Sequence, residues 1–141
     1  MIYMNKGINQ IHRLEEATIL ILNVFNDWEL EWKGDGYNHC DAVGKTPKGF
    51  TCAMEMKFRA KYYETKMLEK YKYDRLMEMD VEVHLYFVAD PKGNYMFWLD
   101  NLEMPEVKNV RCPSSTLWSK KKENKEVYML EENQAAEVNI Y

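Results

Sequence analysis

The stretch DAVGKTPKGFTCAMEMK, from Asp41 to Lys57, decides how this chain folds. Its second half continues as a largely apolar run to Arg59 and follows Pro47-Lys-Gly49, which is a turn signal. We therefore expect a strand over residues 50–59. Because side chains alternate between the two faces of a strand, Glu55 and Lys57 share one face. The opposite face is apolar and consists of Cys52, Met54, Met56 and Phe58.

The charged face of this strand indicates a functional site. Glu55 and Lys57 stand in an otherwise hydrophobic strand, where buried charges need a partner or a metal. Together with Asp41, Glu55 offers the hard oxygen ligands that Mg²⁺ prefers. A lysine beside these acids can orient or deprotonate an attacking water and stabilise a charged transition state. The pattern favours a metal-dependent phosphodiesterase, and an ordinary amphipathic strand with a surface ion pair is the alternative.

The residues before this strand predict its partner. Residues 37–43 read as a short strand with Asp41 near its end, and residues 44–49 read as a hairpin loop. Strands joined by a short loop pair in antiparallel fashion, so Asp41 can face Glu55 across the ladder. The predicted hairpin therefore brings the two acids together.

An amphipathic helix is predicted over residues 9–26. Its apolar residues recur on one face, the face that such a helix turns toward the core. They are Ile11, Leu14, Thr18, Ile21, Phe25 and Trp28. Glu15 falls at the edge of this face and Glu16 nearly opposite, so Glu15 is the better candidate to reach the site. Two surface glutamates are the alternative.

A second helix is predicted over residues 61–79, where Lys66, Lys70 and Tyr73 would share a face. Lysines beside an aromatic side chain can hold a phosphate backbone or stack on a base. A solvated helix flank is the alternative. Further strands are predicted by alternation or strand-forming runs, and the tail from Glu131 is polar. These strands cover residues 28–33, 81–88, 95–99 and 127–130.

The composition describes a soluble globular chain of one domain. Its 141 residues are 46% hydrophobic and 30% charged, and no apolar run approaches the roughly 18 residues that a membrane helix needs. Three cysteines without paired spacing agree with a reducing compartment, so we expect a cytoplasmic protein with no membrane partner. A net charge of −4 argues against a broadly basic surface, although residues 57–75 are locally basic.

The order of these elements, with Asp41 and then Glu55-x-Lys57 on a hairpin, resembles the PD-(D/E)XK nuclease superfamily, including its small archaeal-type Holliday-junction resolvases and phage nucleases. The resemblance implies an α/β, restriction-endonuclease-like core: a central mixed sheet flanked by helices, in the order α-β-β-β-α-β(-β). It implies one nuclease-like domain over residues 1–141, with a core at about 9–100 and a peripheral extension at 101–141.

The resemblance also implies roles for residues. Asp41, Glu55 and the backbone carbonyl of Met56 would bind Mg²⁺ or Mn²⁺, Lys57 would be the catalytic lysine, and Glu15 or Glu16 would supply the helical glutamate. Two positions depart from the family pattern. Cys40 replaces the motif proline, and a Gln-x-x-x-Tyr motif found in some branches is matched only by Glu69 to Tyr73.

The resulting expectation is a metal-dependent endo- or exonuclease that prefers DNA to RNA and recognises nucleic-acid structure or ends. Lys70 and Tyr73 are its candidate substrate-binding residues. Cleavage of two strands by a compact nuclease favours a two-fold homodimer. A non-catalytic module of the same fold that binds nucleic acid or protein is one alternative, and hydrolysis of another phosphate ester is a second.

Overall fold

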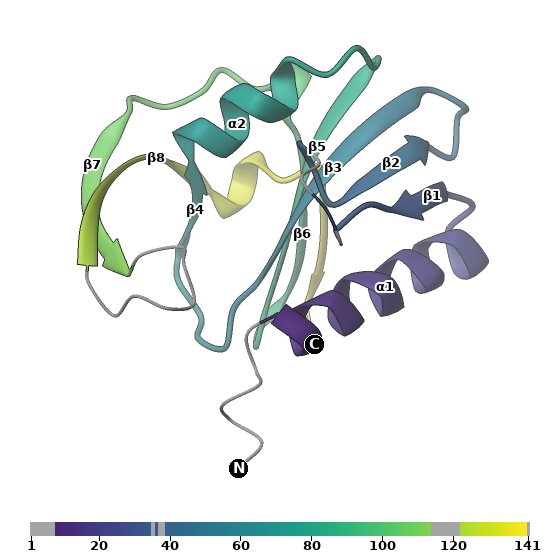
Figure 1. The fold of residues 1–141 in the computed structure, drawn as a ribbon, viewed down its shortest axis with the longest axis horizontal. Coiled ribbons are helices and arrows are strands. Elements are labelled where there is room, and N and C mark those ends of the chain that lie inside the picture. The colour runs from purple at the N-terminus through teal and green to yellow at the C-terminus, as the bar shows by residue number, and fades with distance from the viewer. Residues whose placement is uncertain (1–7, 35, 37–38, 114–121, 141) are drawn as a thin grey trace.

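A mixed six-stranded sheet forms the centre of the computed structural model, which describes residues 8–34, 36, 39–113 and 122–140 (Figure 1). Its strand order is β1-β2-β3-β5-β6-β9, and only the β3–β5 pair is parallel. Three strands, in the order β4-β8-β7, form a separate small sheet. The predicted class, a central mixed sheet flanked by helices, is confirmed.

The described residues form two α-helices and nine strands. The helices and strands are α1 (Ile8–Phe25), β1 (Glu29–Trp32), β2 (Ala42–Lys45), β3 (Thr51–Phe58), β4 (Thr65–Glu69), α2 (Lys70–Met77), β5 (Val83–Asp90), β6 (Gly93–Trp98), β7 (Lys108–Pro113), β8 (Lys122–Glu131) and β9 (Glu137–Ile140). Two short 3₁₀ helices are also present, η2 (Leu99–Asn101) and η3 (Glu132–Gln134).

The main sheet is covered differently on its two faces (Figure 1). Helix α1 packs on one face, where Ile19 joins a core with Trp28 and Met54. Helix α2 and the small sheet lie on the other face, where Leu76 and Leu130 join a core with Tyr86. Strand β3 contributes to both cores, with Cys52, Met54 and Met56 in the first and Ala53 in the second.

The predicted hairpin is present, with shifted ends. Strands β2 and β3 pair in antiparallel fashion with Ala42 opposite Met54, which places Asp41 just before β2 and next to Glu55 of β3. Strand β2 begins later than predicted and runs on to Lys45, into the expected loop. Residues 37 and 38 of the predicted strand lie outside the described residues.

Helix α1 matches the predicted helix and ends at a left-handed residue. Asp27 has a φ of 63°, a conformation that Asp tolerates better than most residues, and the N–H of Trp28 returns to the Leu22 carbonyl at 3.2 Å. The Asn23 side chain exchanges two hydrogen bonds with the Leu30 backbone, at 2.8 and 3.0 Å. These contacts fasten the end of the helix to β1.

The face that α1 buries is not the predicted one. Ile11, Leu14, Ile21 and Phe25 are 39–77% exposed, whereas Ile19 and Glu15 are 6% and 4% exposed. The residues from Ala17 to Phe25 are apolar on almost every side of the helix, so periodicity alone could not select the buried face. The polar anchors Glu15 and Asn23 flank Ile19 at four-residue spacing and turn this side toward β1.

The predicted helix over residues 61–79 is wrong in its first half. Residues 65–69 form β4, which pairs with β8 so that Lys66 lies opposite Leu130, and only Lys70–Met77 is helical. Local sequence could not show this pairing, because the partner strand is distant in the chain. Lys66 consequently does not share a helix face with Lys70 and Tyr73, as the sequence had led us to expect.

Lys66 instead joins the two sheets. Its side chain is 2% exposed, and its Nζ lies 2.9 Å from Asp90 Oδ2 and 3.1 Å from Glu132 Oε1. The same ammonium lies over the rings of Tyr62 and Tyr95, 4.4 and 4.2 Å from their centroids. A buried charge of this kind is stable only with its partners in place.

The C-terminal half adds strands to both sheets. The predicted hairpin is confirmed as β5 and β6, and the predicted strand at 127–130 lies within the longer β8. After Glu131 the chain forms η3 and then β9, which pairs with β6. The division into a core and an extension at residue 101 stays a prediction. Among the described residues, no helix is long and apolar enough to span a membrane.

Candidate active site

Asp41 is held by three backbone contacts where β1, β2 and β3 meet. Its N–H donates to the Met54 carbonyl at 3.0 Å, and its own carbonyl accepts from the Lys33 N–H at 2.7 Å. Its side-chain Oδ2 accepts from the Met56 N–H at 2.8 Å. The carboxylate is therefore oriented by the backbone of the strand that carries Glu55.

The carboxyl groups of Asp41 and Glu55 lie close enough to influence each other's ionisation. Burial and the charge of Asp41 raise the pKa of Glu55 to about 8, and burial raises the pKa of Asp41 as well. Two buried acids in contact cannot both ionise cheaply unless a cation joins them. This pair therefore meets the chemical requirement of a divalent cation site.

The donor set fits a cation that keeps much of its water. No group of three or more His, Cys, Asp or Glu side chains in the described part of the chain is arranged to hold a metal ion, so the pair stands alone. Mg²⁺ is commonly held by one or two carboxylates with several waters completing its octahedron. Two carboxylates suit Mg²⁺ or Mn²⁺ and would be too few for a structural zinc site.

Lys57 lies two residues beyond Glu55 on the same face of β3. It lines one pocket with Glu55, Arg59 and Lys72. Burial, followed by the positive charges of Lys72 and Arg59, lowers the pKa of Lys57. The pocket thus places a lysine that releases its proton more readily than usual beside a buried acid.

Lys72 belongs to this site although the sequence did not single it out. Its Nζ lies 3.9 Å from Glu55 Oε1 and 3.6 Å from Glu69 Oε2. Burial opposes its ionisation, but the charges of Glu55 and Glu69 outweigh burial and raise the pKa of Lys72. The three-residue spacing from Glu69 to Lys72 was a usable signal only once a helix was known to begin at Lys70.

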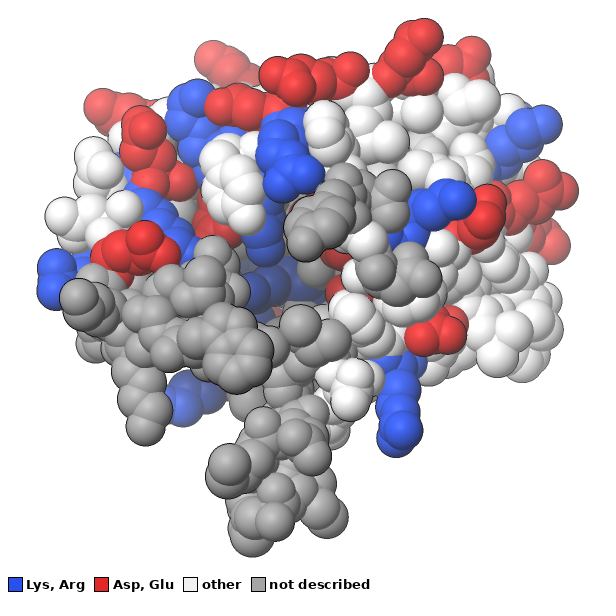
Figure 2. Space-filling model, in the orientation of Figure 1, with Lys and Arg blue, Asp and Glu red and all other residues white. Residues whose placement is uncertain are grey.

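Glu69 forms the outer side of the pocket, between two lysines. Its Oε1 accepts from Lys125 Nζ at 2.7 Å, and burial is outweighed by Lys125 and Lys72, so that the pKa of Glu69 is lowered. Its Oε2 is buried without a hydrogen-bond partner among the described residues. Figure 2 shows Lys and Arg side chains in and around a hollow in the middle of this face, with acidic side chains along its upper edge.

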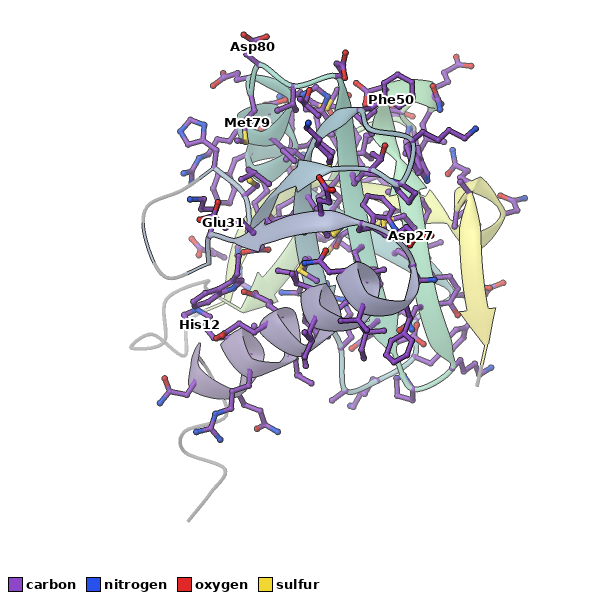
Figure 3. All side chains as sticks on the ribbon, turned by 90° about the vertical axis from the view of Figure 1, so that its right-hand side faces the viewer. His12, Asp27, Glu31, Phe50, Met79 and Asp80 are labelled. Atoms are coloured by element: carbon purple, nitrogen blue, oxygen red, sulfur yellow. The ribbon has the colours of Figure 1, made fainter. Side chains whose placement is uncertain are left out.

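Glu15 approaches the pair from α1. Its Oε1 accepts a hydrogen bond from Trp32 Nε1 at 2.9 Å, and burial together with the charge of Asp41 raises its pKa to about 7. Gly34 makes room for this contact, since a Cβ there would lie 2.5 Å from Glu15 Oε1. Glu16 is exposed. His12, on the same helix, packs edge-on against Trp32 with ring centroids 5.1 Å apart (Figure 3).

The remaining predicted residues lie farther out. Lys70 pairs with Asp74 at 2.6 Å on the outer side of α2, and the Tyr73 ring packs against Tyr128 with centroids 5.1 Å apart. Neither is among the residues that line the pocket. The Met56 side chain is buried in the core beneath α1, and its N–H is the backbone group that contacts Asp41. The roles predicted for these three residues stay predictions.

Comparison with known proteins finds a likeness in solved structures. No family model and no curated protein matches the chain. A solved structure of Hjc from Archaeoglobus fulgidus, a Holliday junction resolvase from an archaeal hyperthermophile, is similar over 82% of this chain and 88% of its own. The two share 14% sequence identity, with a TM-score of 0.49. A likeness of this degree concerns the path of the chain and says nothing about activity.

Proposed function

We propose that this chain is a metal-dependent nuclease of the PD-(D/E)XK superfamily that hydrolyses phosphodiester bonds of DNA. The observation that carries the proposal is the neighbouring pair of Asp41 and Glu55, with Lys57 two residues beyond Glu55 on the same face of β3. Two carboxylates that can hold a metal ion, with a lysine beside them, are the groups that metal-dependent phosphodiester hydrolysis requires. Glu55 and Lys57 line one pocket with the basic side chains of Arg59 and Lys72, which supports an anionic substrate.

Asp41 and Glu55, with the Met56 carbonyl, are the proposed ligands for Mg²⁺ or Mn²⁺. The bound ion would supply Lewis acidity, lowering the pKa of a coordinated water and offsetting phosphate charge. The backbone N–H of Met56 orients Asp41 for this role through its 2.8 Å hydrogen bond. The raised pKa of Glu55 means that proton release and metal binding are coupled in this site.

The chain's own cations have separate proposed roles. Lys57 orients the attacking water and takes up its proton, since burial and neighbouring charges lower the pKa of Lys57. Arg59 and Lys72 line the same pocket and bind the non-bridging oxygens of the phosphate. Glu15 fixes the position of Trp32 and adds negative charge near Asp41. Lys70 and Tyr73 are proposed to contact DNA outside the pocket.

The substrate is proposed to be recognised by its structure or its ends. The net charge of −4 argues against a broadly basic surface that would hold any duplex, so we propose that binding depends on the local group of basic side chains (Figure 2). Phosphate contacts position a nucleic acid without reading its sequence. Such a pocket accordingly suits a junction, nick or terminus better than a defined sequence.

One observation favours a second candidate, a non-catalytic module of the same fold. Lys72 already gives the acid pair a cationic partner, 3.9 Å from Glu55, so the pair has a role in holding α2 on the sheet without any metal. In that case Asp41 and Glu55 would act structurally. Nucleic acid or a protein would then bind without being cleaved.

A cleavage assay combined with calorimetry tests the proposal. Linear, circular, single-stranded, nicked and four-way-junction substrates are incubated with Mg²⁺ or Mn²⁺ and either wild type or Lys57→Ala. A nuclease cleaves at least one substrate, and Lys57→Ala reduces the rate by about 10²-fold or more. Mn²⁺ titration of Asp41→Ala and Glu55→Ala should show loss of the binding site.

Glu31→Ala serves as the matched control, because Glu31 is an exposed acid on β1 whose 3.1 Å partner is Lys33. This variant should bind Mn²⁺ and cleave like wild type. Full activity of Lys57→Ala on every substrate would refute the role of Lys57. Absence of both cleavage and Mn²⁺ binding in wild type would instead favour the non-catalytic module.

A further inference from the structure

We infer that the outer face of α1 binds a second copy of this chain. The helix exposes six large apolar side chains: Ile11, Leu14, Leu20, Ile21, Val24 and Phe25. Phe25 is 77% exposed and Leu20 is 62% exposed. In Figure 3 the helix lies in front of the main sheet, and no other described element covers its outer side.

The exposed apolar area is large enough to require an explanation. From the exposed fractions and the sizes of these side chains, the six residues present roughly 700 Å² of surface. The largest apolar patch on a typical monomer is roughly 300–600 Å². A standard protein interface buries about 800 Å² on each partner. The α1 face therefore has nearly the area that a stable dimer contact needs.

The same surface contains both a ridge and a groove. Beside the exposed side of α1 lies a groove of about 290 Å³, whose lining includes Leu14 and Ile21 of the helix and Phe58, Ala89 and Met96 of the sheet. A two-fold contact pairs one surface patch with an identical patch, so the patch must be complementary to itself. A helix ridge adjoining an apolar groove meets this requirement, because each ridge can enter the partner's groove.

Four of the exposed apolar residues of α1 are also spaced almost symmetrically about Thr18. Ile11 and Phe25 lie seven residues on either side of Thr18, and Leu14 and Ile21 lie four before and three after it. An antiparallel pair of α1 helices crossing at Thr18 would therefore set Ile11 against Phe25 of the partner subunit. Thr18 tolerates this position because its hydroxyl donates to the Leu14 carbonyl at 2.8 Å within its own helix.

Charge favours a second copy as well. The stretch from Ala17 to Phe25 contains no charged residue, so two copies meet there without like-charge repulsion. Antiparallel helices also place the positive end of one helix dipole beside the negative end of the other. Glu15, whose ionisation responds to Asp41 of the candidate active site, lies on the buried side of α1, so the dimer contact leaves the site uncovered by α1.

Analytical ultracentrifugation of the full chain tests this surface. Wild type should sediment as a dimer at micromolar concentration, and the double variant Ile21→Glu, Phe25→Glu should sediment as a monomer with at least a 100-fold weaker association. Phe50→Glu is the matched control. Phe50 is 47% exposed but lies in the β2–β3 loop, well away from α1 (Figure 3), so this variant should remain dimeric. Circular dichroism verifies that all three proteins are folded.

A cysteine placed at the proposed two-fold axis gives an independent readout. Thr18→Cys should form a covalent dimer on mild oxidation, whereas Glu16→Cys, which is exposed but lies on nearly the opposite side of α1 from Thr18, should not. Cys40 and Cys52 are buried, and wild type treated in the same way measures any background. A monomeric wild type, a dimer that survives the double glutamate change, or equal cross-linking at positions 16 and 18 would each overturn the inference. None of these measurements depends on cleavage activity.

Discussion

Lys72 Nζ lies 3.9 Å from Glu55 Oε1, so a lysine from α2 faces the acid at the centre of β3. The acid and the lysine come from separate elements, so the contact joins β3 to α2 across the pocket. The same ammonium lies 3.6 Å from Glu69 Oε2. Lys72 therefore lies beside the proposed metal ligand Glu55, and a bound metal ion would compete with the Lys72 ammonium for this carboxylate.

Replacing Lys72 should strengthen metal binding and weaken cleavage. Lys72→Ala removes the competing positive charge, so the affinity for Mn²⁺ should rise by about ten-fold, equivalent to ~1.4 kcal/mol. Loss of a phosphate contact should lower the cleavage rate by about 10- to 100-fold. Calorimetry at a pH above the Glu55 pKa of about 8 measures the affinity for Mn²⁺ while Glu55 is ionised.

Lys70→Ala is the matched control, because Lys70 lies on the same helix and pairs with Asp74 instead of a site acid. Its affinity for Mn²⁺ should equal that of wild type. A drop in DNA binding in this variant would support the role predicted for Lys70 outside the pocket. Unchanged Mn²⁺ affinity in Lys72→Ala would show that the Lys72 ammonium and Mn²⁺ do not compete for Glu55.

Stability of the metal-free protein should fall as the pH rises. The pKa of Glu55 is about 8 in the folded chain against an ordinary value of 4.5, so the unfolded chain ionises first. The folded state therefore loses stability progressively between about pH 4.5 and pH 8, and Glu15, with a pKa of about 7, adds to the loss. In EDTA the unfolding temperature should drop by several degrees over this range.

The variant Glu55→Gln should flatten this dependence, because the amide cannot ionise. Added Mn²⁺ should restore much of the wild-type stability at high pH, since it binds only the folded, ionised site. Differential scanning fluorimetry in matched buffers measures both effects. A wild-type unfolding temperature that rises from pH 5 to pH 8 in EDTA would contradict the pKa assigned to Glu55.

Gly34→Ala should disturb Glu15 through direct contact. The added methyl carbon would lie 2.5 Å from Glu15 Oε1 and 2.6 Å from Trp32 Nε1, so one of these groups must move. The expected cost is about 1–3 kcal/mol of unfolding free energy, accompanied by a change in tryptophan emission. Urea unfolding followed by fluorescence measures both quantities.

Gly49→Ala separates the effect of contact from that of backbone strain. Gly49 has a φ of 88°, but a Cβ there would meet no atom within 4 Å. This variant should lose stability through strain, while its emission spectrum in the folded state should stay that of wild type. Identical spectra for Gly34→Ala and wild type would argue against the Glu15–Trp32 contact.

Removing the Lys66 charge should be among the most destabilising changes in the chain. Lys66→Met leaves Asp90, whose side chain is 1% exposed, without its partner, and should cost about 3–5 kcal/mol. The double variant Lys66→Met, Asp90→Asn should recover part of this loss, because the amide oxygen can still accept from the Lys92 and Gly93 N–H groups. Chemical denaturation of the single and double variants gives the coupling free energy.

Features set by local sequence were predictable. The antiparallel hairpin that carries Asp41 and Glu55 and the β5–β6 hairpin follow from short loops and strand-forming runs. Glu15 is buried and Glu16 exposed, as expected, although the apolar stripe used to orient the helix is itself exposed. Such features depend on neighbours within a few residues, which a single sequence contains.

Features set by distant pairing were not predictable. Strand β4 exists because it pairs with β8, and without knowledge of β8 its residues resemble the start of a helix. The buried side of α1 depends on the Glu15–Trp32 and Asn23–Leu30 contacts, which outweigh a stronger apolar stripe. Lys72 was missed for the same reason, since its position follows from where β4 ends and α2 begins.

The side of the pocket that carries Glu69 and Lys72 belongs to the connection between the parallel strands β3 and β5. Glu55 and Lys57 belong to β3 itself, which is anchored by strands on both sides. Insertions or exchanges within that crossover would therefore reshape what the pocket admits while leaving the acids where they are. Under the proposed function, exchange of this one segment would alter which substrates the pocket admits while Glu55 and Lys57 keep their positions.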